Sequence, residues 1–184
     1  SQRLKFNMES IGNAIDKFST IEGAISTSAN LQMLGGSFAA QFSNPLQAMG
    51  EALLDAEGFT KRITDTFAST AIFNKETGQV EMSAIDKRLM KEAAKQLGIS
   101  YEEAWNMASQ QAKIGDVERQ INKTQNFSEE DKSWITSNSQ YNAETKQHQV
   151  SFFENGETIS KDIDWNASSA DKITWNKSGI MSWS

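Results

Sequence analysis

The chain has 184 residues, a mass of 20.4 kDa and a formal net charge of −6, with 18 Lys and Arg against 24 Asp and Glu. This balance supplies no basic field for phosphates, so we expect no specific binding to nucleic acid. With no Cys, one His and one Pro, the sequence lacks the residues of thiol nucleophiles, His-based triads and most metal sites. We therefore predict no enzymatic activity and no cofactor or metal.

Apolar residues near the N-terminus recur at helical spacing. Leu4, Met8, Ile11, Ile15 and Phe18 follow one another at intervals of 4, 3, 4 and 3 residues, and the stripe continues to position 25. A helix with this stripe packs against another helix, within the chain or in a neighbour. We favour packing in a bundle over a long coiled coil, because glycines interrupt the pattern. The five residues are candidate partner-binding residues.

The least polar stretch covers residues 31–42 and contains the pair Gly35-Gly36, which predicts a break between helices. A buried turn is the favoured interpretation, and a membrane-active segment is the alternative. Because the stretch is too short to span a bilayer, we expect no stable membrane insertion, although transient membrane contact stays open. Asn44-Pro45 then predicts the start of a helix that Gly58 ends, with Leu46, Met49 and Leu53 on its apolar face.

The middle of the chain carries further helix signals. Phe59, Ile63 and Phe67 predict a helix, and residues 72–82 predict a short hairpin or tight loop. Capping-box patterns at 83–86 and 100–103 predict two helices separated by Gly98, which together form an αα-hairpin. A third cap at 128–131 predicts a short helix. The acidic residues in these caps are explained by the helix dipole and need no catalytic role.

The pattern changes beyond residue 140. Asn155-Gly156 between apolar segments predicts a β-hairpin with a type I′ turn. Residues 163–184 are rich in Ser, Asn and Asp, so we predict an extended tail that becomes ordered on a neighbouring protein through Trp165, Trp175 and Trp183. The single histidine, His148, is predicted to be exposed in a loop.

Two short sequence motifs each occur twice in the chain. Phe73-Asn74-Lys75-Glu76-Thr77 returns as Tyr141-Asn142-Ala143-Glu144-Thr145, and a second echo relates residues 163–166 to 173–176. These echoes are either remnants of repeated modules or chance matches in an Asn-rich chain.

The segment 82–108, with a helix ending in Leu-Gly-Ile-Ser and a following acidic-capped helix that carries Met-Ala, resembles a module of large virion-internal proteins of tailed bacteriophages. The segment 127–131, Tyr141-Asn142 and the Asn155-Gly156 hairpin are similar to the region C-terminal to that module in those chains. These are tape-measure-like proteins and the cargo proteins of crAss-like phages. The resemblance covers residues 72–160 and carries over no functional residue. It implies a piece of a longer polypeptide that is packaged in capsid or tail and ejected with the genome.

The sequence thus predicts a mainly α fold of helical hairpins in an elongated arrangement, with one or two small β-hairpins in the C-terminal part and an extended tail. Four segments are expected: N-terminal helices in 1–58, a helical hairpin module in 59–127, a short helix plus β-hairpin in 128–162, and the tail in 163–184. Because the sequence begins with Ser1 and not with Met, we also expect it to be a fragment or a processed product.

The predicted function is that of a structural or cargo component of a phage virion. Its partners are other virion proteins of the portal, capsid or tail, with multiple copies allowed. It is located inside the virion, and in the host cytoplasm or envelope after ejection. The alternative is a soluble helical adaptor that binds a partner helix through residues 4–25.

Overall fold

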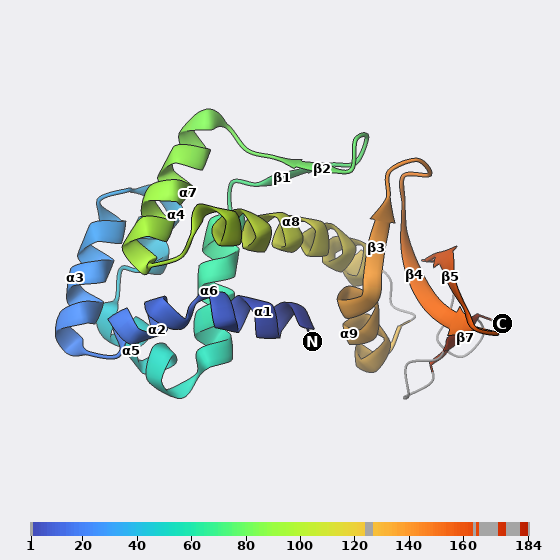
Figure 1. Ribbon diagram of the computed structural model, residues 1–184, viewed down its shortest axis with the longest axis horizontal. Coiled ribbons are helices and arrows are strands. Elements are labelled where there is room, and N and C mark those ends of the chain that lie inside the picture. Colours follow the sequence, from blue (N-terminus) through green and yellow to red (C-terminus); the bar gives the residue numbers. More distant parts are fainter. Residues whose placement is uncertain (1, 124–126, 164, 166–172, 176–180, 184) are drawn as a thin grey trace. The chain divides into compact units, whose positions relative to one another are not determined.

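The computed structural model describes residues 2–123, 127–163, 165, 173–175 and 181–183, and the described chain is mainly helical with small antiparallel sheets (Figure 1), as the sequence predicts. The helices are α1 (Gln2–Ser10), α2 (Gly12–Phe18), α3 (Ile21–Gln32), α4 (Gly36–Gln41), α5 (Pro45–Leu54), α6 (Ala56–Ala68), α7 (Ala84–Leu97), α8 (Tyr101–Lys123) and α9 (Glu129–Asn138). The strands are β1 (Ile72–Asn74), β2 (Gln79–Glu81), β3 (Ser139–Asn142), β4 (Gln147–Glu154), β5 (Glu157–Asp162), β6 (Ile173–Trp175) and β7 (Met181–Trp183).

The chain divides into two compact units. Unit 1 comprises Ser1–Ile72 and Val80–Ala112, and unit 2 comprises Phe73–Gln79 and Lys113–Ser184. The tip of the β1–β2 hairpin therefore belongs to unit 2, although its base belongs to unit 1. The four-segment division predicted from the sequence stays a prediction.

Unit 1 is a helical bundle around aromatic side chains. Helix α3 packs against α5, and α2 packs against both, while α6 packs against α1, α4 and α5. At the centre the ring of Phe18 lies 5.6 Å from that of Phe42 and 5.3 Å from that of Phe59, and all three residues are fully buried. Tilted ring pairs at these separations contribute to stability beyond the area that they bury.

The N-terminal stripe does not form one continuous helix, contrary to the prediction. The chain turns at Ile11 and again before Thr20, whose hydroxyl accepts a hydrogen bond from the backbone N–H of Gly23 at 3.0 Å and so caps α3. The cap at Thr20 starts α3 as a new helix after α2. The break between α1 and α2 lies at Ile11, which has no side-chain cap. Ile25, which the periodic pattern places on the same stripe, is 51% exposed.

The boundaries of α5 and α6 depend on side-chain caps. Asn44 accepts a hydrogen bond from the N–H of Gln47 and Pro45 occupies the first turn of α5, as predicted. Helix α5 ends at Leu54 and not at Gly58, because Asp55 accepts from the N–H of Gly58 at 3.0 Å and caps α6. Gly58 therefore lies in the first turn of α6, and the predicted end at this residue is wrong.

Helix α7 begins and ends, and helix α8 begins, where the sequence signals lie. Ser83 caps α7 together with Asp86, and Gly98 ends it with a positive φ of 70°. Ser100 and Glu103 then form a reciprocal capping box at the start of α8. Hydrogen bonds from Ser100 and then from Ser10 hold the pKa of Glu103 below its ordinary value. The carboxylate is used as a helix cap, as the sequence indicates.

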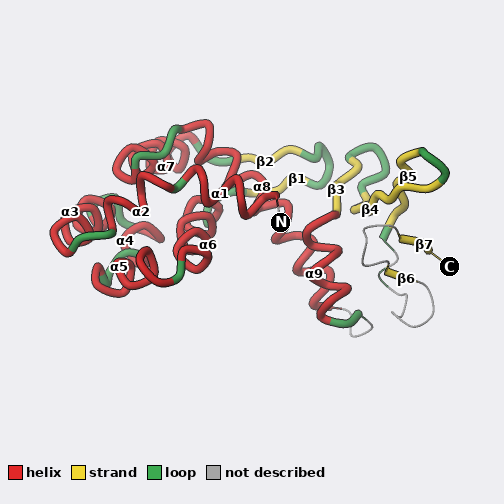
Figure 2. Tube along the Cα trace, turned by 60° about the horizontal axis from the view of Figure 1, so that its bottom comes forward, coloured by secondary structure: helices red, strands yellow, loops and turns green. Residues whose placement is uncertain are grey.

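Unit 2 contains α9 and the three-stranded antiparallel sheet β3-β4-β5 (Figure 2). The predicted hairpin is present: Asn155 (φ 53°) and Gly156 (φ 80°) join β4 to β5 with the two positive φ values of a type I′ turn. The core is formed by apolar residues of α8, α9 and β4 and of the segments next to α9 and β5, namely Val117, Ile121, Phe127, Ile135, Val150 and Ile163.

The predicted tail contains two short strands in its described parts. Strand β6 pairs with β7 in antiparallel fashion, with Trp175 opposite Met181. The segments are extended, as predicted, but they also pair with each other, which no sequence pattern indicated.

Candidate functional site

The two copies of the repeated five-residue motif, residues 73–77 and 141–145, fold into the same turn. In the first copy the side-chain oxygen of Asn74 accepts from the backbone N–H groups of Glu76 (2.9 Å) and Thr77 (3.4 Å). In the second copy the oxygen of Asn142 accepts from Glu144 (2.9 Å) and Thr145 (3.3 Å). Each turn closes a hairpin, β1–β2 in one case and β3–β4 in the other. The likeness of geometry at equal positions supports the interpretation as a repeat.

The two turns end in the same backbone conformation with different residues. Gly78 has a φ of 73°, and Lys146, which occupies the equivalent position of the second copy, has a φ of 57°. Left-handed backbone is easy for glycine and costs about 1 kcal/mol for other residues. The second copy therefore bears a strain that the first does not.

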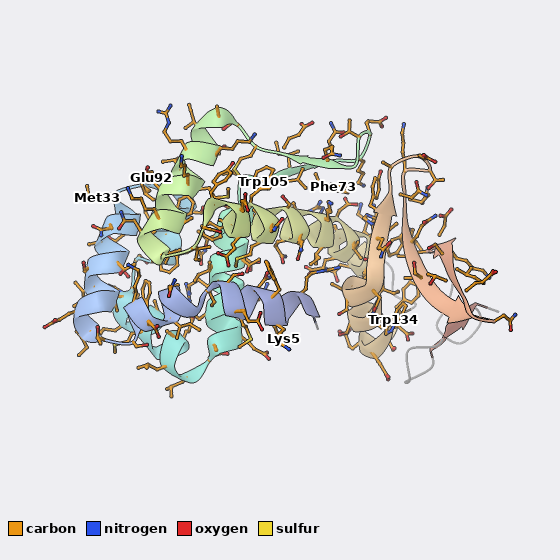
Figure 3. The ribbon with its side chains drawn as sticks, viewed as in Figure 1. Lys5, Met33, Phe73, Glu92, Trp105 and Trp134 are labelled. Atoms are coloured by element: carbon orange, nitrogen blue, oxygen red, sulfur yellow. The ribbon has the colours of Figure 1, made fainter. Side chains whose placement is uncertain are left out.

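The two turns lie side by side in unit 2 (Figure 1, Figure 2). The hydroxyl of Tyr141 donates to the backbone carbonyl of Lys75 at 2.5 Å, and Lys146 Nζ donates to Glu76 Oε2 at 2.5 Å. The ring of Phe73, which β1 carries (Figure 3), meets that of Tyr141 edge to face at 4.8 Å. One copy of the repeat is thus packed on the other.

A buried ionic cluster lies beneath these turns. Asp116 of α8 is 3% exposed, and its Oδ2 lies 2.6 Å from Nε2 of His148 on β4. The other carboxylate oxygen, Oδ1, lies 3.1 Å from Lys75 Nζ and 3.4 Å from Arg119 Nη2. Since a carboxylate accepts and does not donate, Nε2 of His148 carries the shared hydrogen. A buried carboxylate with three cationic or N–H partners satisfies the conditions for a stable buried charge.

His148 is 6% exposed and enclosed by rings, so the predicted exposed loop histidine is wrong. Its imidazole lies 5.0 Å from the ring of Tyr141, 6.2 Å from that of Phe73 and 6.4 Å from that of Trp165. Residues of the polar turn surround it in sequence, but the register of β3 with β4 places His148 opposite Tyr141. The alternation of β4, which buries His148 and Val150, is the sequence signal that identifies this face.

The pKa of Asp116 is shifted by its surroundings. Burial alone raises the pKa of Asp116, but hydrogen bonds from His148 and Lys75 outweigh burial and hold the pKa below its ordinary value of 3.8. The carboxylate is therefore ionised at neutral pH. Its acceptor positions are taken up by groups of this chain, so we interpret the cluster as an anchor for the turns and not as acid–base machinery.

The predicted partner-binding residues of the N-terminal stripe lie mostly in the core of unit 1. Ile11 and Phe18 are fully buried, and Ile15 packs against the same core. Leu4 and Met8 are partly buried. The apolar stripe is therefore covered largely by helices of this chain.

The three tryptophans of the predicted tail have different placements. Trp165 is partly buried against the core of unit 2 and faces His148. Trp175 and Trp183 belong to β6 and β7, and their side chains lie outside the described part of the structure. Within the described residues, Asp116 and Lys75 were not predicted from the sequence, because no local pattern links them to His148.

Of the predicted apolar face of α5, Met49 packs partly against the core, but Leu46 and Leu53 do not. Ala48 and Ala52 point into the core, whereas Leu46 is 57% and Leu53 55% exposed. Small residues face the core here because α5 packs closely on α2, α3 and α6. Other large apolar side chains of unit 1 are also exposed, including Ile21 and Ile25 of α3, Met33 directly after it (labelled in Figure 3) and Leu54 of α5.

The described residues contain no cluster of three or more His, Asp or Glu side chains arranged to hold a metal ion. Over the same part of the chain, none of the helices combines the length and apolarity needed to cross a bilayer. Comparisons with protein-family models, curated proteins and solved structures give no match to this chain.

Proposed function

We propose that this chain is a structural component of a tailed-phage virion and acts without catalysis, as part of a longer polypeptide packaged in capsid or tail. The resemblance of residues 72–160 to virion-internal proteins supports the setting. The anchor role of the buried cluster supports the structural class, because the carboxylate and imidazole are both used to hold the fold.

The observation that carries the proposal is the exposure of six apolar side chains on or next to α3 and α5 of unit 1, namely Ile21, Ile25, Met33, Leu46, Leu53 and Leu54. Leu54 is 90% and Met33 85% exposed, and four further Ile and Leu residues of α3 and α5 are more than half exposed. Burying one such side chain in an interface contributes roughly 1.5–3 kcal/mol. A chain with a mean hydropathy of −0.56 has few apolar residues to spare, so this exposure fits a protein that is covered by a neighbour.

The second candidate is a helical adaptor that binds a partner helix through residues 4–25. Burial of Ile11 and Phe18 in unit 1 leaves Ile21 and Ile25 as the exposed apolar residues of that region. These two are among the six exposed apolar side chains named above. We therefore rank the adaptor second.

The test is photo-crosslinking in assembled particles from the source of the sequence. A benzophenone amino acid replaces Leu54, and the matched control carries it at Lys61 of α6, whose side chain is 71% exposed. We expect position 54 to crosslink to a particle protein and position 61 to do so at least several times less. Mass spectrometry of the product identifies the neighbour and the length of the parent polypeptide. Absence of the chain from purified particles would remove the proposal.

A further inference from the structure

Strand β5 is an edge of the three-stranded sheet of unit 2. The order β3-β4-β5 places β4 between the other two strands (Figure 1), and no strand of the described residues pairs with the outer side of β5. The opposite edge is different, because Tyr141 of β3 contacts Phe73 and Lys75 of the β1–β2 hairpin. An open edge presents backbone N–H and C=O groups to an incoming strand. The outer side of β5 is therefore a candidate surface for strand addition.

The pairing of β5 with β4 determines which backbone groups of β5 face outward. Along an antiparallel strand, residues that bond the neighbouring strand alternate with residues whose N–H and C=O groups point away from it. The N–H of Ile163, directly after β5, donates to the carbonyl of His148 at 3.0 Å, and these two residues continue the register of β5 with β4. Every second residue before Ile163 therefore bonds β4, namely residues 161, 159 and 157. The outward backbone groups belong to Thr158, Ser160 and Asp162.

A second copy of β5 can meet this edge in only a few registers. Because only outward groups can bond, an antiparallel pair sets positions 158, 160 and 162 of one copy opposite the same positions of the other. The register with 158 opposite 160 also sets Ile159 opposite Ile159 and Glu157 opposite Lys161. The neighbouring registers, with 158 or 160 opposite itself, set Ile159 opposite a charged residue, and a further shift sets Lys161 opposite Lys161. Of these registers, only the first brings opposite charges together.

The side chains of β5 are complementary to themselves in this register. Glu157 and Lys161 are exposed, and Ile159 is only partly buried against the core of unit 2. These positions form the pairs without backbone hydrogen bonds, where side chains on adjacent strands approach most closely, and opposite charges or two apolar residues are favourable there. The symmetric match of charge to charge and Ile to Ile indicates a second copy of this chain, since an unrelated strand would share it only by chance.

We propose that β5 pairs antiparallel with β5 of a second copy about a two-fold axis at Ile159, so that the two sheets join into one. The interface is isologous, and each Glu157 meets the Lys161 of the other copy. Because residues 157–161 form a short contact, we expect the dimer at protein concentrations of about 100 µM to 1 mM. The proposal goes beyond the proposed function and does not depend on the virion setting.

The test reverses the two charges in the full chain. Glu157→Lys sets lysines opposite each other and Lys161→Glu sets glutamates opposite each other, so each variant alone should dimerise about tenfold more weakly than the wild type. An equimolar mixture of the two should recover the dimer, because opposite charges again meet at both positions, and this recovery shows that both variants are folded. Sedimentation velocity up to about 1 mM measures each sample. The matched control is Glu144→Lys, an equal charge change at an exposed position of the β3–β4 turn, which should leave the dimer unchanged.

A single thiol measures the register, since the chain has no Cys. The Cα atoms of the two Ile159 residues should lie about 4.5 Å apart, which a disulfide can bridge, whereas those of Ser160 should lie more than about 7 Å apart, which it cannot. Oxidation should therefore crosslink Ile159→Cys at least several-fold faster than Ser160→Cys. A wild type that is monomeric up to about 1 mM would overturn the proposal. So would a dimer that Glu157→Lys leaves intact, a mixture that fails to recover it, or equal oxidation of the two Cys variants.

Discussion

At the scale of single residues, Asp116 has the strongest claim to a specific role. It is a buried carboxylate on α8 whose two nearest partners, His148 and Lys75, come from a strand and a hairpin that are both distant in sequence. Such a group stabilises the fold only when its partners are present, because an uncompensated buried charge is expensive. The cluster therefore makes the docking of the first turn and the packing of β4 depend on each other.

We predict that Asp116→Ala lowers the free energy of unfolding by about 3 kcal/mol, the range found when one partner of a buried ion pair is removed. The matched control is Asp65→Ala, which removes an exposed i,i+4 partner of Lys61 and should cost less than about 1 kcal/mol. Urea denaturation of the full chain measures both. Equal effects of the two substitutions would show that the buried cluster contributes nothing special.

Acid should weaken the same cluster. The pKa of Asp116 is lowered in the folded chain, so its contribution to stability is complete above the ordinary value of 3.8 and is lost as the pH falls through the folded pKa. Between about pH 5 and about pH 2, the wild type should therefore lose more free energy of unfolding than Asp116→Asn. Parallel pH profiles for the two proteins would contradict the assignment.

The core residue Ile11 offers a third test at this scale. Because its side chain is fully buried in unit 1, Ile11→Ala should cost about 2–5 kcal/mol, and Ile11→Asp more, since it also strands a charge. Ile25→Ala, at a half-exposed position of the same predicted stripe, should cost clearly less. Thermal and urea unfolding distinguish these results, and similar values for Ile11→Ala and Ile25→Ala would count against the packing.

At the scale of elements, the repeated turn shows how one local structure takes two uses. The Asn side chain fixes each turn by the same pair of hydrogen bonds, although the residue after it differs between the copies. The two turns differ at Lys75, where the second copy has Ala143, and at Gly78, where the second copy has Lys146. Local sequence specifies the turn, and two side chains specify its partner.

Reciprocal substitutions at the equivalent turn positions should differ in their effect on stability. Gly78→Ala places a Cβ against Ala143 at a φ of 73°, so we expect a loss of about 2 kcal/mol or more. Lys146→Gly relieves a left-handed residue and loses only an exposed ion pair with Glu76. We expect it to change the free energy of unfolding clearly less than Gly78→Ala does, in either direction, as measured by urea denaturation. A loss in Lys146→Gly as large as that in Gly78→Ala would refute the distinction between the turns.

At the scale of the whole molecule, the buried residues of unit 1 stabilise the fold, and its exposed apolar residues are the candidates for interaction with a partner. The aromatic core of Phe18, Phe42 and Phe59 is complete within the chain. The exposed aliphatic side chains of α3 and α5 are not among the buried residues of that core. They are therefore the residues whose substitution should affect assembly without affecting folding.

We predict that the double substitution Leu53→Ser and Leu54→Ser changes the free energy of unfolding by less than about 1 kcal/mol, since both side chains are more than half exposed. It should lower incorporation of the chain into particles several-fold. The control, Ala48→Ser and Ala52→Ser on the buried face of α5, should lower stability instead. Normal incorporation of the Leu variant would show that this surface is not the contact.

Much of the local structure of this protein was determined by the sequence alone. Caps at Asn44, Ser83 and Ser100, and the Asn155-Gly156 turn, act through hydrogen bonds and dihedral angles of neighbouring residues, so short patterns identified them. The repeated word was also visible in the sequence, because an Asx turn needs only its own few residues.

Only the tertiary structure decided which residues are buried and which distant residues contact each other. Periodicity placed residues 4–25 on one helix, whereas the cap at Thr20 and the packing of three short helices broke the stripe. It placed Leu46 and Leu53 on a buried face, whereas close helix packing chose Ala48 and Ala52. The polar residues around His148 predicted an exposed loop, whereas Asp116, 32 residues away in the sequence, and three aromatic rings enclose the imidazole. Burial and ion pairing are properties of contacts between distant segments, and a local pattern carries no information about the distance between them.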